Sequence, residues 1–238
     1  KMQSIQRDSK SKPGFMSLIR QPTVYKPSII LLFLLFFQQA CCIYPLSAYT
    51  LHVLPQLGKS LGEKYKHNIF IVISSVRLLI SILTTIFLSK FNQKQLLSIS
   101  FIGMLLFSLP LVGFQIFDIS TDSSTGTLWN DWIMLIFFVL YTAAGCIGAV
   151  GIPWTIIFEL LPTEVRGTLG PYFVAFGYLI MSAFLKGFFT VLSAIGILYI
   201  FLIVGLVSLA GSVFISLYVP QTRGLTLYDI ENRFSTKK

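Results

Sequence analysis

The chain has 238 residues and a formal net charge of +9, with 55% hydrophobic and only 11% charged residues. Its mean hydropathy is +0.79. Soluble domains contain about 25% charged residues, so this chain lacks the polar groups that would cover a water-soluble domain of its length. The composition excludes an ordinary soluble enzyme and indicates an integral membrane protein.

Six apolar stretches are long enough to cross a bilayer as helices, which takes about 20 residues each. The predicted spans are Pro27 to Leu51, Asn68 to Ser89, Leu96 to Phe117, Trp132 to Phe158, Leu169 to Phe189, and Ala194 to Val219. None shows the two-residue alternation of a membrane β-strand. The sequence predicts an all-α membrane protein with six transmembrane helices in residues 27–219, between a cytoplasmic linker (1–26) and a cytoplasmic tail (220–238).

The basic residues are divided unequally between the two sides of this topology. Of the 18 Lys and Arg residues, thirteen lie on the side of the termini, four lie on the other side, and Arg77 lies within a span. The positive-inside rule then places both termini of this multi-pass chain in the cytoplasm. Because the charge is divided among tails and loops, no continuous basic patch for nucleic acid is expected.

The sequence contains no pattern typical of a catalytic or metal site. A metal-binding His pair, a nucleophile elbow and a phosphate-binding glycine loop are all absent. Cys41, Cys42 and Cys146 lie inside predicted spans, where disulfides and zinc sites are not expected. We therefore expect neither enzyme activity nor a cofactor.

Polar side chains gather in the middle of the first span. Gln38 and Gln39 are followed within about three turns by Tyr44 and Ser47. Amides and phenols both donate and accept hydrogen bonds, which suits a neutral polyhydroxyl solute. Hydrogen bonding between helices is the alternative role. Pro45 removes a backbone hydrogen bond beside this cluster and predicts a weak point in the helix.

The fourth span combines small residues with a helix breaker. Gly145, Gly148 and Gly151 precede Pro153 and Trp154. Broken helices at membrane depth are tolerated where they line a cavity, and transporters place binding sites there. The indole of Trp154 offers a flat face on which a sugar ring can stack. Close helix packing is a second, compatible role for the glycines.

Arg77 lies about nine residues, or roughly 14 Å, into the second span. A charge near the membrane centre costs a few kcal/mol. No acidic residue lies at mid-depth in the six predicted spans. We expect Arg77 to face a solute pathway or to pair with a group outside these spans.

Several motifs in this order resemble one family. They are Pro22-Thr-Val-Tyr-Lys-Pro27 leading into Phe36-Phe-Gln-Gln39, Val76-Arg77, Pro153-Trp154, and Val219 to Gly224. Together they resemble the C-terminal half of a sugar porter of the major facilitator superfamily, helices seven to twelve, over about residues 13–234. Within that family the insect facilitated trehalose transporter-like proteins are most similar.

The resemblance implies a facilitative carrier that moves trehalose or a hexose by alternating access across the plasma membrane. It also implies that the chain is one half of a twelve-helix protein whose partner is an N-terminal six-helix half. By position, the residues implied to bind substrate are Gln38, Gln39, Tyr44, Arg77 and Trp154. Those implied in gating are Pro45, Gly151 and Pro153. Those implied in a cytoplasmic ion-pair network are Glu159, Arg166, Lys90, Lys94 and Arg223.

The chain also departs from the family pattern. Tyr44 and Arg77 replace asparagines, and Gly177-Tyr178 replaces an Asn-Trp pair. The loop motif Asp/Glu-Arg-x-Gly-Arg-Arg is here Ser89-Lys-Phe-Asn-Gln-Lys94. Two alternatives therefore stay open: a carrier for another organic solute, such as an anion attracted by Arg77, and a transport-inactive solute sensor on the same fold.

Overall fold

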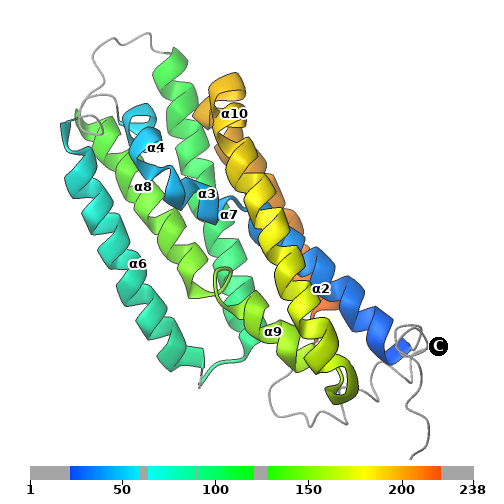
Figure 1. Cartoon of the computed structure of the whole chain (residues 1–238). Helices are drawn as coiled ribbons and strands as arrows, with labels where there is room; N and C mark the ends of the chain where they lie inside the picture. The colour runs from blue at the N-terminus through cyan, green and yellow to red at the C-terminus, as the bar shows by residue number, and fades with distance from the viewer. Residues whose placement is uncertain (1–21, 59–63, 89, 121–127, 221–238) are drawn as a thin grey trace, which may run out of the picture.

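The computed structural model describes residues 22–58, 64–88, 90–120 and 128–220. Within these ranges the chain is helical and contains no strand. The helices, shown in Figure 1, are α2 (Pro22–Ala40), α3 (Ile43–Ala48), α4 (Thr50–Leu57), α6 (Lys66–Leu88), α7 (Gln93–Ser120), α8 (Leu128–Ile147), α9 (Ile152–Leu160) and α10 (Thr163–Tyr218). Most of the predicted linker and tail, including Arg223, lies outside the described residues.

The described helices supply six membrane crossings, as predicted. Five apolar helical segments are long enough to span a bilayer, and the last of them has 54 residues, enough for two crossings. Its two arms meet at Gly196, whose φ of 81° and ψ of 169° are not helical. Glycine adopts a positive φ without the steric cost that a Cβ imposes. The reversal therefore falls at Gly196, beyond the predicted break between residues 189 and 194.

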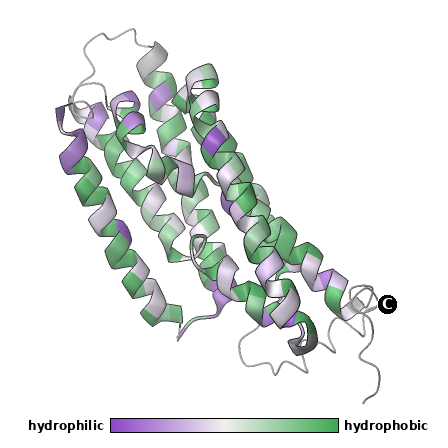
Figure 2. Ribbon diagram, viewed as in Figure 1, coloured by the Kyte–Doolittle hydropathy of each residue, from purple (hydrophilic) through white to green (hydrophobic). Residues whose placement is uncertain are grey.

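The helices form a bundle with α6 at one edge, where it contacts α8 and α4 (Figure 1). Ile73 is the buried residue of α6, and most of its other apolar side chains are exposed. Hydrophobic residues continue along the lengths of the helices in Figure 2. Such surfaces lie against lipid or against other membrane helices.

The first crossing consists of three helices instead of the single helix predicted from Pro27 to Leu51. It begins at Pro22, a residue that the first turn of a helix accommodates. It then breaks after Ala40, where Cys42 adopts a left-handed conformation with φ of 54°. Pro45 explains this position, because it has no N–H to donate to the carbonyl four residues earlier, that of Cys41.

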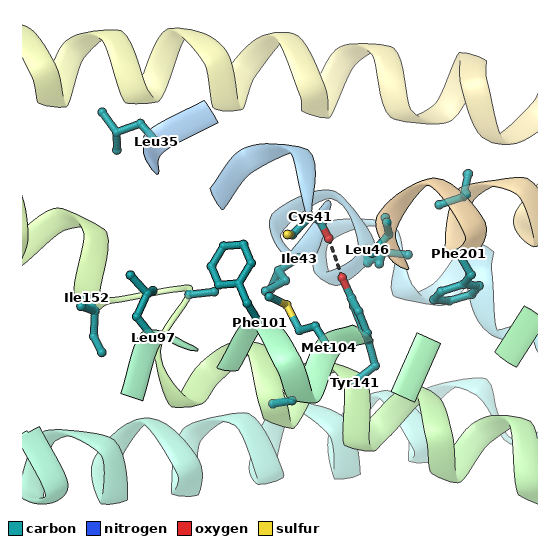
Figure 3. Packing of buried hydrophobic residues seen from close by; sticks show 14 of the residues in the cluster. Leu35, Cys41, Ile43, Leu46, Leu97, Phe101, Met104, Tyr141, Ile152 and Phe201 are labelled. Carbon is teal, nitrogen blue, oxygen red and sulfur yellow. Dashed lines mark hydrogen bonds between the residues drawn. The ribbon is translucent and has the colours of Figure 1, made fainter. Parts of the chain in front are cut away.

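The freed carbonyl of Cys41 obtains its hydrogen bond from another helix. The hydroxyl of Tyr141, on α8, donates to it at 2.5 Å (Figure 3). Tyr141 is fully buried, and its ring meets Phe201 of α10 edge-on at 6.1 Å between centroids. The break in the first crossing is thus fixed to the core of the bundle.

The fourth crossing is also broken, between Ile147 and Ile152, within the range predicted as one helix from Trp132 to Phe158. A Cβ on Gly148 would lie 2.7 Å from the carbonyl oxygen of Leu96, so the glycine allows the break to touch α7. Ser100 of α7 accepts a hydrogen bond from the N–H of Ala149 at 3.0 Å. It also donates to the carbonyl of Ala144 at 2.7 Å.

The Tyr141→Phe substitution should lower the stability of the bundle by about 1–3 kcal/mol, because it leaves a buried carbonyl without a donor. The midpoint of thermal unfolding in detergent measures this loss. Tyr199→Phe is the matched control, since that tyrosine is exposed on α10.

The loss of stability caused by Tyr141→Phe should be smaller when the chain also carries Pro45→Ala. There the restored N–H of residue 45 can donate to the Cys41 carbonyl in place of Tyr141. A double-mutant cycle isolates this coupling. Equal losses in both backgrounds would show that the Tyr141 bond does not compensate for Pro45.

Candidate functional site

The two helix breaks face each other at the carbonyl of Val150. The N–H of Trp154 bonds to the Gly151 carbonyl at 3.2 Å, so the Val150 carbonyl lacks its usual helical donor. Two side chains from the first crossing donate to it instead. Gln38 Nε2, on α2, and the Tyr44 hydroxyl, on α3, each lie 3.0 Å away. Residues more than one hundred positions apart thus meet at one backbone atom.

Trp154 completes this cluster from α9. Its Nε1–H donates to the Tyr44 hydroxyl at 3.2 Å. Its ring stacks on Tyr178 of α10, with centroids 5.2 Å apart and planes inclined by 27°. A Cβ on Gly177 would lie 2.8 Å from the indole atom Cη2. Gly177 and Tyr178 therefore fix the position and tilt of the indole.

Unsatisfied amide groups lie beside the cluster. Gln38 and Gln39 are only 1% and 0% exposed. Within the described part of the chain, both polar atoms of the Gln39 amide and Oε1 of Gln38 have no hydrogen-bond partner. A buried polar atom left unpaired costs about 1–3 kcal/mol. Unpaired buried polar groups are rare in folded proteins, and each one calls for an explanation.

Arg77, the twelfth residue of α6, lines a cavity together with Val150. This cavity of about 280 Å³ lies between α6 and α8. The lining residues are Ser74, Arg77, Leu78, Ser81, Cys146 and Val150. The structure thus brings four predicted substrate residues, Gln38, Tyr44, Trp154 and Arg77, around Val150, with Gln39 adjacent in the chain.

The predicted gating residues lie at the two breaks. Pro45 is in the first turn of α3, and Pro153 is at the start of α9. Gly151 precedes α9, and a Cβ added there would meet no atom within 4 Å. The two prolines therefore stand directly after the segments where the helices are interrupted.

Toward the end of the bundle predicted to be cytoplasmic, three of the predicted ionic residues each form a hydrogen bond with a neutral group. Glu159 accepts a hydrogen bond from Gln93 Nε2 at 2.5 Å. Arg166 donates through Nε and Nη2 to the Leu161 carbonyl, at 3.2 and 3.0 Å. Lys94 Nζ donates to the Ser216 carbonyl at 2.8 Å. The network of Glu159, Arg166, Lys90, Lys94 and Arg223 stays a prediction.

Sequence reasoning did not identify Val150, Ser100 or Tyr141. Val150 acts through its backbone, for which no side-chain motif exists. The spacing of Pro45 could have pointed to a freed carbonyl at Cys41, but not to its donor 100 positions away. Among the described residues, no group of three His, Cys, Asp or Glu could hold a metal.

The chain is similar to known membrane transporters. The model of the family described as sugar (and other) transporters matches residues 1–234. The facilitated trehalose transporter Tret1 of Culex quinquefasciatus is 29% identical over 224 residues, which are 94% of this chain and 42% of that protein. That of Aedes aegypti is 29% identical over 223 residues, 94% of this chain and 27% of that protein.

The Tret1 of Drosophila willistoni is 30% identical over 209 residues, which are 87% of this chain and 23% of that protein. The chain therefore spans less than half the length of these curated relatives. The match of the family model covers nearly the whole chain, and five apolar helical segments of the structure are long enough to cross a membrane. The chain belongs to the sugar transporter family and is an integral, multi-pass membrane protein.

Proposed function

We propose that the chain is the C-terminal half of a facilitative carrier that moves a sugar, trehalose or a hexose, by alternating access. The observation that carries this proposal is the meeting of Gln38, Tyr44 and Trp154 at the Val150 carbonyl. These groups supply amide and hydroxyl hydrogen bonds together with an aromatic ring. That combination suits a solute with many hydroxyls on an apolar ring framework.

The two breaks suit a helix pair that bends during transport. Gln38, Gln39 and Tyr44 lie on either side of the α2–α3 break. Val150 lies in the α8–α9 break, and Trp154 lies just after it. Movement at Pro45, Gly151 or Pro153 would therefore change the binding groups and the access path together. Discontinuous helices at a substrate site are a common device of secondary transporters.

The proposed partner is an N-terminal six-helix half, because carriers of this kind bind substrate between two repeats. The exposed faces of α6 and of the first arm of α10 are suitable surfaces for it. Large exposed apolar residues there include Leu78, Leu79, Tyr172, Phe176 and Leu179. We place the protein in the plasma membrane with both termini of this chain cytoplasmic, as the positive-inside rule indicates.

The ionic residues at the cytoplasmic end are proposed to form a lock that changes with the conformational state. Glu159 and Arg166 are separated by the turn at Pro162, and each has a neutral partner in this structure. A rearrangement that exchanges Gln93 and the Leu161 carbonyl for a direct ion pair would supply one of two alternative states.

The test is uptake of labelled trehalose and glucose by vesicles that contain the chain, alone and with the N-terminal half of a trehalose transporter. Saturable sugar uptake that requires both halves supports the proposal. Sugar binding without uptake in either preparation would favour a transport-inactive sensor. Competition by organic anions but not by sugars would favour a different solute.

The Gln39→Leu substitution should weaken sugar binding about tenfold, as expected for losing one or two hydrogen bonds. It should leave thermal stability unchanged or raised, because both polar atoms of this buried amide lack partners among the described residues. Equilibrium binding of labelled sugar and thermal unfolding measure the two effects on the same samples.

Gln115→Leu is the matched control. Gln115 is also buried, but its Nε2 donates to the Gln56 carbonyl at 3.2 Å. This substitution should lower stability and leave sugar affinity unchanged. If Gln39→Leu behaved in the same way, Gln39 would be structural and the proposed binding site would be wrong.

The Gly177→Ala substitution should reduce sugar affinity several-fold, because the new methyl group would displace the Trp154 indole from its place against α10. Gly187→Ala, in the same arm of α10, has open space around the new Cβ and serves as the control. Sugar titrations of both variants check the effect. Equal affinities would mean that the indole position does not matter for binding.

A further inference from the structure

The cavity beside Arg77 has the composition of an anion-binding site. Ser74, Arg77 and Ser81 follow one another at spacings of three and four residues along α6, and all line the cavity. Residues so spaced share one face of a helix. This face presents a guanidinium between two hydroxyl groups, so every polar side chain that α6 places there can donate a hydrogen bond.

The charge of Arg77 is not balanced by its surroundings. Its Nε atom is buried and lacks a hydrogen-bond partner among the described residues. None of the six residues that line the cavity is acidic. Asp131 is near the start of α8, about 22 Å along that helix from Cys146. Glu159 is about two turns beyond the α8–α9 break and is bonded to Gln93.

The cavity adjoins the proposed sugar site. Val150 lines the cavity, and its carbonyl accepts hydrogen bonds from Gln38 and Tyr44. A solute bound at Arg77 would therefore lie against the residue that joins the two helix breaks. A volume of about 280 Å³ is at the small end for a ligand pocket, so the cavity suits one part of a solute.

A carboxylate is the anionic group that fits these donors best. The guanidinium is planar and matches the two oxygens of a carboxylate in a bidentate pair. Its own five N–H donors exceed what the cavity walls satisfy. The flanking serine hydroxyls can donate to the same oxygens. A neutral sugar would leave this charge without a counter-ion.

We propose that the Arg77 cavity is a carboxylate subsite and that the carrier prefers sugar acids to neutral sugars. This inference rests on the proposed function and extends its substrate class from neutral sugars to sugar acids. The subsite is formed by Arg77, Ser74 and Ser81, while Gln38, Gln39 and Trp154 hold the sugar ring.

The test is equilibrium binding of labelled glucuronate, glucose and lactate to the full chain, reconstituted in lipid vesicles with the N-terminal half of a trehalose transporter. Glucuronate should bind about tenfold or more tightly than glucose, in line with a charge-assisted hydrogen bond. Arg77→Gln should abolish this preference, because it should weaken glucuronate binding about tenfold more than it weakens glucose binding. Lys66→Gln removes the same charge from the start of α6 and should keep the preference.

Arg77→Lys is a second variant that keeps the charge but loses the planar fork. It should retain only part of the preference for glucuronate. This variant also tests the subsite if Arg77→Gln does not fold. If Arg77→Lys preferred glucuronate to glucose as strongly as the unmodified chain does, the guanidinium would have no specific role.

The remaining outcomes separate this inference from the proposed function. Glucuronate binding no tighter than glucose, with glucose binding dependent on Gln39, would overturn the subsite and leave sugar transport standing. Equal binding of lactate and glucuronate through Arg77, without glucose binding, would support the anion subsite and overturn the sugar function. A folded chain that binds none of the three, even together with the N-terminal half, overturns both.

Discussion

The site depends on two backbone carbonyls that have lost their helical hydrogen bonds inside a bilayer. Lipid offers no donor, so each freed carbonyl requires a partner from the protein. The Cys41 carbonyl receives the Tyr141 hydroxyl, and the Val150 carbonyl receives Gln38 and Tyr44. The first bond fixes the broken first crossing to α8. The second joins that crossing to the break between α8 and α9, so the two irregular segments form one unit.

Trp154 connects this unit to the first arm of α10. Trp154 bonds to Tyr44 on one side and stacks on Tyr178 on the other. The close approach of Gly177 leaves the indole little freedom to tilt. A displacement of α9 would therefore change the environment of Tyr44 and the contact with α10 together. Trp154 thus contacts both the first crossing and the first arm of α10 from its own position on α9, where the helices are interrupted.

The crossings and the polar cluster were predictable because they follow from local sequence. Apolar length determines the spans, and Pro45 and Pro153 mark the regions of the breaks. The partners were not predictable, because Tyr141 and Cys41 are 100 positions apart and Val150 contributes only its backbone. The turn at Gly196 was also misplaced by several residues. Hydropathy does not distinguish the end of one apolar helix from the start of the next, whereas the positive φ does.

Arg77 is the residue for which stability and function conflict most clearly. A guanidinium near the middle of a span costs about 2.5–3.5 kcal/mol on insertion scales, and nothing in its cavity carries the opposite charge. The Nε atom of Arg77 is buried and has no hydrogen-bond partner among the described residues. A neutral side chain would remove this cost. A bound solute anion would pair with this guanidinium. The free energy that the unpaired charge costs would then contribute to the affinity for the anion.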